Sequence, residues 1–158
     1  MEQEKQKTEE ELAAKIMEYA RDELMISMRF LDRALFRMPL VAADSVAAFG
    51  VDGATMYYNP EYVLHAFKRE KNACTRAFLH MILHCIFSHP FQYEKLDREC
   101  WDLATDLAVE QSILDLNLKC VVLERDASLK RTLSHLAQKV PILTAEKIYR
   151  WLYENPEE

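Results

Sequence analysis

The sequence has very few of the residues that build turns. Glycine occurs only twice, at Gly50 and Gly53, and proline five times in 158 residues. Sandwiches and doubly wound sheets need many tight turns, so this scarcity disfavours both architectures. Half of the residues are hydrophobic, with many leucines, alanines and methionines beside glutamates and lysines. The composition therefore predicts a mainly α-helical protein with a real core, folded as one domain over residues 1–158.

Strong positive charge, paired cysteines and long apolar runs are also missing. The net charge is −6 without any run of lysine or arginine, which argues against a nucleic-acid or membrane surface. The four cysteines form no C-x-x-C pair, and the charged amino terminus does not resemble a signal peptide. No stretch reaches the roughly 18 apolar residues of a membrane span. We therefore expect a reducing, cytoplasmic setting, with no membrane and no nucleic-acid partner.

Hydrophobic periodicity predicts helices along most of the chain. Apolar residues at helical spacing indicate a first helix over residues 8–37, with Thr8 and Glu11 as a capping box and Pro39 beyond its end. Later helices are predicted over residues 60–67, 71–88, 97–114, 128–139 and 145–153.

One segment favours strands. Asp52-Gly53 lies between two β-prone runs and predicts a hairpin within residues 46–59, the only credible strand pair. The fold class is therefore mainly α with one small hairpin or short sheet (α+β). Residues 1–7 and 155–158 are expected to be solvated tails.

Two histidines, His80 and His84, are four residues apart in an apolar part of the predicted helix 71–88. Both imidazoles then project from one face and could hold one divalent ion, for which zinc is the best candidate. This is the spacing of the H-E-x-x-H helix of zinc peptidases. The position of its general base, however, is occupied by Met81, whose thioether cannot take a proton from water near neutral pH. The pattern predicts a metal site with weak or lost peptidase activity.

A zinc site needs a third protein ligand, and the sequence offers two. On a continuous helix His89 would point about 140° away from His84, so it can join only if the chain turns at Ser88–Pro90. Asp106 comes from the next predicted helix and can supply the third ligand if that helix packs against the histidine helix. Asp102 could orient one of the histidines by a hydrogen bond to its other ring nitrogen. We favour Asp106, because it needs no special loop conformation, and keep His89 as the alternative.

Other titratable residues receive simpler interpretations. Glu94, Glu99 and Glu110 could in principle replace the missing base, but nothing in their spacing singles one out. His65 and His135 lie on other predicted helices and are read as ordinary, partly exposed histidines.

Four motifs follow one another along the chain and carry a resemblance to a known family. They read Asp-Gly-Ala-Thr-Met-Tyr-Tyr-Asn-Pro-Glu-Tyr from Asp52, His-x-x-x-His-x-x-x-x-His-Pro from His80, Trp-Asp-Leu-Ala-Thr-Asp-Leu-Ala-Val-Glu from Trp101, and Thr-Ala-Glu-Lys-Ile-Tyr from Thr144. Over residues 30–153 the chain resembles the bacterial putative metallopeptidase domain that usually stands ahead of a von Willebrand factor A-like domain.

The resemblance implies a zincin-like helical domain in which His80 and His84 bind zinc and Asp106 or His89 completes the site. Met81 departs from the glutamate of the family. The A-like domain is absent from this chain, which suggests a shortened chain or a stand-alone relative, with such a domain as a candidate partner in cis or in trans.

Two functional classes stay open on the sequence alone. The first is a metallopeptidase-like domain that binds zinc and takes a peptide or protein as its partner. The second is a metal-free protein-interaction module with structural histidines. A weaker resemblance is to the bacterial ribosomal-RNA-maturation endoribonucleases, whose third histidine is spaced one residue further. The acidic net charge and the four-residue gap before His89 argue against that family.

Overall fold

A computed structural model describes residues 2–92 and 94–156. Within them the chain forms helices α1 Glu2–Ser27, α2 Asp32–Arg37, α3 Pro60–Arg69, α4 Ala73–Ile86, α5 Arg98–Leu116, α6 Asp126–Lys139 and α7 Ala145–Glu154. It also forms strands β1 Leu40–Ala42, β2 Phe49–Val51 and β3 Met56–Tyr58, and 3₁₀ turns η1 Arg29–Leu31, η2 His89–Phe91 and η3 Lys119–Val121. The architecture is mainly α with one short sheet, as predicted.

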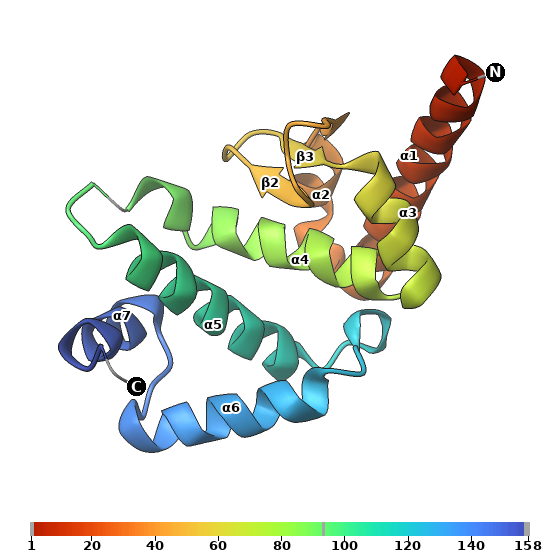
Figure 1. The fold of residues 1–158 in the computed structure, drawn as a ribbon. Coiled ribbons are helices and arrows are strands. Elements are labelled where there is room, and N and C mark those ends of the chain that lie inside the picture. Colours follow the sequence, from red (N-terminus) through yellow and green to blue (C-terminus); the bar gives the residue numbers. More distant parts are fainter. Residues whose placement is uncertain (1, 93, 157–158) are drawn as a thin grey trace.

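Helix α4 lies at the centre, with α1, α3 and the sheet on one side and α5 to α7 on the other (Figure 1). One hydrophobic cluster joins the first group to α4 through fully buried side chains such as Met17 and Phe78. A second cluster joins α5, α6 and α7 around Trp101 and Ile148. Helix α5 connects the two, because Val109 on its other side packs into the first cluster. The two hydrophobic clusters thus fix the position of α5 relative to α4.

The predicted hairpin is confirmed, and one strand was missed. β2 pairs antiparallel with β3, with Gly50 opposite Tyr57. Asp52 closes the turn by accepting hydrogen bonds from the backbone N–H groups of Ala54 and Thr55 at 2.8 and 2.7 Å. β1 adds to β3 in parallel, giving the order β1-β3-β2. Three residues are too short to show a β periodicity, which is why the sequence did not indicate β1.

The predicted first helix differs from the structure at its start. Residues 2–7, expected to be a tail, form the first turns of α1, and the side chains of residues 4–7 are exposed. Thr8 does not cap the helix, because its hydroxyl donates to the carbonyl of Glu4 inside the helix at 2.8 Å. At the other end of the chain, residues 157–158 of the second predicted tail lie outside the described residues.

The same predicted helix is also broken near its end. Met28 leaves the helical conformation (φ −135°, ψ 66°), and the chain continues through η1 into α2. Arg21 of α1 donates to the carbonyl of Met38 at 2.9 Å. On an unbroken helix these groups, 17 positions apart, would be separated by about 25 Å. The break therefore makes this tertiary contact possible, and it occurs without a proline or glycine at that point.

The later helices begin within two residues of their predicted starts, and α4 begins at Ala73 instead of residue 71. Three of them have capping side chains that accept a hydrogen bond from the backbone N–H three residues later, at 3.1, 2.9 and 3.4 Å respectively: Asn59, Asp97 and Thr144. Helix α6 starts at Asp126, slightly earlier than predicted. Among the described residues, none of the helices combines the length and apolar character needed to cross a bilayer.

Candidate metal centre

Helix α4 is anchored by one apolar face and presents two histidines on another. Phe78, Leu79 and Ile82 are at most 1% exposed, so this face is fixed in the core. The side chains of His80 and His84 keep 15% and 13% exposure. Their spacing of one turn brings the two Nε2 atoms to 2.9 Å from each other. Both rings therefore meet on the face of α4 that looks toward α5.

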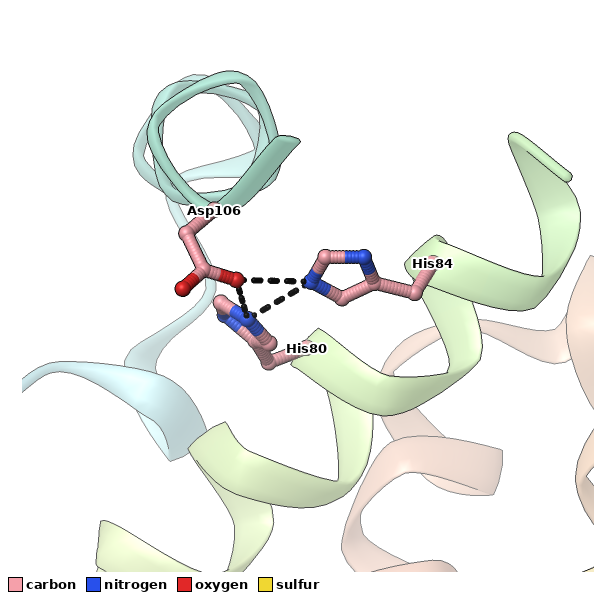
Figure 2. Close-up of side chains that lie close together, drawn as sticks. All are labelled: His80, His84 and Asp106. Atoms are coloured by element: carbon pink, nitrogen blue, oxygen red, sulfur yellow. Dashed lines mark hydrogen bonds and ion pairs between the residues drawn. The ribbon is translucent and has the colours of Figure 1, made fainter. Parts of the chain in front are cut away.

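Asp106 reaches the same point from α5. Its Oδ1 lies 3.3 Å from Nε2 of His80 and 3.1 Å from Nε2 of His84. Figure 2 shows the three side chains converging from the two helices. Each residue offers one ligand atom, and the three atoms lie within 4.8 Å of one another.

The separations between these atoms suit a single divalent ion. Ligands at roughly 2.0–2.1 Å from a tetrahedral zinc lie about 3.3 Å from one another. The three separations here range from 2.9 to 3.3 Å. Two imidazole nitrogens and one carboxylate oxygen are also a donor set used by zinc sites that keep an open fourth position. The residues present therefore fit a divalent metal.

A buried carboxylate stands behind His80. Oε1 of Glu110 lies 2.8 Å from Nδ1 of His80, and its Oε2 pairs with the guanidinium of Arg76. Arg76 is 2% exposed and also binds Asp126 and the carbonyl of Val121. This network fixes the orientation of His80 and links α4 and α5 to the start of α6.

Asp102 does not have the role that the sequence analysis gave it. Its side chain is 67% exposed and lies 3.9 Å from an arginine of its own helix, whereas Glu110 takes the position behind His80. The signal was nevertheless present in the sequence. Glu110 follows Asp106 by four residues and Arg76 precedes His80 by four, so each pair shares one face of its helix.

The chain turns sharply after α4, and this turn places His89. Ser88 adopts the left-handed conformation (φ 59°), and η2 follows. His89 then lies with its Nδ1 3.2 Å from Nδ1 of His84, the ring nitrogen remote from Asp106. The structure thus gathers His80, His84 and Asp106, and it places His89 behind His84.

The electrostatics of the centre favour a cation. Partial burial opposes ionisation of Asp106, yet hydrogen bonds from His80 and His84 hold the pKa of this carboxyl well below its usual range. Burial likewise opposes ionisation of Glu110, but hydrogen bonds from His80 and Arg76 lower its pKa to about 2. Burial also disfavours the charged form of His80, and hydrogen bonds to Asp106 and Glu110 nevertheless raise its pKa. Both carboxylates are therefore negative at neutral pH.

Two cavities flank the cluster. One, of about 550 Å³, opens between α3, α4 and α5, and the other, of about 740 Å³, opens between β2, η2 and α5. Phe49, Met81 and Asp106 line both. Met81, which follows His80 directly, is half-buried. Glu94 and Glu99 are exposed and lie outside the three-residue cluster.

Comparison with known proteins agrees with the site. The family described as "Putative metallopeptidase domain" matches residues 13–158, a longer segment than the four sequence motifs cover. No match was found among curated proteins or among solved structures. With nearly the whole chain matched and a His/His/Asp cluster on the expected helix, the chain belongs to the putative metallopeptidase domain family.

Proposed function

We propose that this domain binds one divalent cation, zinc, through His80, His84 and Asp106. The observation that carries the proposal is the convergence of three ligand atoms from two helices at separations of 2.9–3.3 Å. A set of two imidazoles and one carboxylate suits zinc better than magnesium or calcium, which prefer oxygen ligands. The family description supports the same class of site.

A divalent ion held here would supply Lewis-acid chemistry, polarising a carbonyl group and activating water. The chain's own residues prepare the position. Glu110 accepts a hydrogen bond from the Nδ1–H of His80, which leaves the His80 Nε2 lone pair free, while Arg76 keeps Glu110 ionised. Asp106 contributes the negative charge that a cation requires.

The partner best suited to the two cavities is an extended peptide or protein segment. β2 lies at the edge of the sheet, and its residue Phe49 lines both cavities. A sheet edge can align an extended chain through main-chain hydrogen bonds while side chains enter flanking pockets. A von Willebrand factor A-like domain, in cis or in trans, is a further candidate partner suggested by the family resemblance.

We propose that catalysis is weak or lost. General acid–base assistance is typically worth about 10²–10⁴-fold, and Met81 cannot supply it. A peptide could then be bound at the site without being cleaved efficiently.

Metal analysis tests the first part of the proposal. We expect protein purified without a histidine tag to retain close to one zinc per chain after dialysis, and His84→Ala to lose it. His135→Ala is the matched control, because His135 is an exposed histidine on α6. Equal and negligible zinc in all three proteins would exclude the metal site and favour the alternative, a metal-free interaction module with structural histidines.

The third ligand is tested by a pair of substitutions on α5. Asp106→Asn should weaken zinc binding by at least about 10–100-fold, whereas Asp102→Asn, one turn away, should change it little. Competition with a chromophoric chelator measures both affinities. Unchanged affinity in Asp106→Asn, together with loss in His89→Ala, would instead make His89 the third ligand.

A further inference from the structure

The two histidines of the centre differ in what supports them from behind. Nδ1 of His80 faces a carboxylate, Glu110, at 2.8 Å. Nδ1 of His84 faces another imidazole, that of His89, at 3.2 Å. Neither the sequence motif nor the family description assigns a role to this second contact.

The fold holds the His89 ring tightly. His89 is 7% exposed and follows the left-handed Ser88 at the start of η2. The ring of Trp101 lies edge-on to it, with centroids 5.9 Å apart, and the Trp101 Nε1–H donates to the His89 carbonyl at 3.4 Å. Because its backbone and Trp101 fix the His89 ring, this ring can hold the neighbouring His84 ring in one orientation.

The protons between the rings can be counted. Two facing imidazole nitrogens at 3.2 Å can share only one proton, so one donates and the other accepts. Nε2 of His84 points at Asp106 and His80, where a lone pair is needed to bind a cation. When Nε2 binds a cation, the proton of a neutral His84 sits on Nδ1 and is donated to His89.

We propose that His89 is a positioning residue that acts through His84: its Nδ1 accepts the His84 Nδ1–H and so holds the His84 Nε2 lone pair toward the metal position. This inference rests on the proposed zinc site. Zinc binding by the wild type tests the site, whereas a comparison of His89 variants tests the role of the hydrogen bond.

Two substitutions separate the hydrogen bond from packing. In His89→Asn the amide oxygen can replace Nδ1 as an acceptor, whereas His89→Phe keeps an aromatic ring beside Trp101 but accepts nothing. Competition with a chromophoric chelator reports the zinc affinity of the wild type and of both variants. Thermal unfolding of both variants monitors the fold.

Zinc affinity should fall about 10–100-fold in His89→Phe and stay within a few-fold in His89→Asn. Equal weakening in both variants, or unchanged affinity in His89→Phe, would overturn the inference while leaving the zinc site in place. A wild type that binds no zinc would refute the proposed function itself.

Discussion

Met81 is the residue on which the proposed loss of catalysis depends. It follows His80 directly, is half-buried, and lines both cavities beside Phe49. Two neighbouring carboxylates have other surroundings: Glu110 is held by Arg76 and His80, and Asp102 projects from α5 with 67% exposure. The proposed function therefore predicts that metal binding and catalysis can be separated.

If catalysis is lost because of Met81, as we propose, a carboxylate at position 81 should confer part of it. We expect Met81→Glu to show zinc-dependent cleavage of an unstructured protein that exceeds the wild-type rate by up to about 10²–10⁴-fold. Met81→Gln is the matched control, because it has similar size and polarity but cannot act as a base. Efficient cleavage by the wild type that disappears in His84→Ala would mean that another residue is the base.

The β2–β3 hairpin supports the segment that carries His89. Gly53, at the tip of the hairpin, has a positive φ of 92°, and its open face lies against the ring of Phe91 in η2. A side chain at this position would both strain the backbone and collide with that ring. The hairpin and η2 are therefore coupled through one glycine.

Gly53→Ala should destabilise the protein by about 1–2 kcal/mol, because an L-residue pays a steric cost in the left-handed region. Gly50→Ala provides the control, since a Cβ there would meet only Val46 Cγ1 at an ordinary 3.5 Å. Urea-unfolding midpoints compare the two variants. Equal midpoints for both would show that the hairpin tip does not support η2.

At the scale of the whole molecule, the α4–α5 groove is held by a buried ionic network. Arg76 on α4 binds Glu110 on α5 and Asp126 at the start of α6, and all three side chains are at most 10% exposed. Arg125 approaches the same Glu110 at 3.5 Å but is 60% exposed. The two arginines offer a comparison between a buried and an exposed partner of one carboxylate.

Arg76→Met should lower the free energy of unfolding by about 3–5 kcal/mol, because it leaves two buried carboxylates without their cation. Arg125→Met should cost less than about 1 kcal/mol, since solvent screens the exposed pair. Chemical denaturation measures both values. If the two variants lost similar free energies of unfolding, the buried ionic network would not contribute more to stability than the exposed ion pair.

Much of this protein could be predicted from local patterns. The capping residues Asn59, Asp97 and Thr144, the Asp52-Gly53 turn and the shared face of His80 and His84 all depend on neighbours within a few residues. Such features follow from helix and turn geometry, which a sequence expresses directly.

Only the tertiary structure decided how these elements meet. The break in the first predicted helix brings Arg21 to the carbonyl of Met38, and the three-residue strand β1 exists only because β3 lies beside it. The spacing made both His89 and Asp106 candidates for the third position. The structure distinguishes the two residues by the nitrogen of His84 that each one faces, Nε2 for Asp106 and Nδ1 for His89. These positions are set by the turn at Ser88 and by the packing of α5 on α4. No local sequence pattern contains that information.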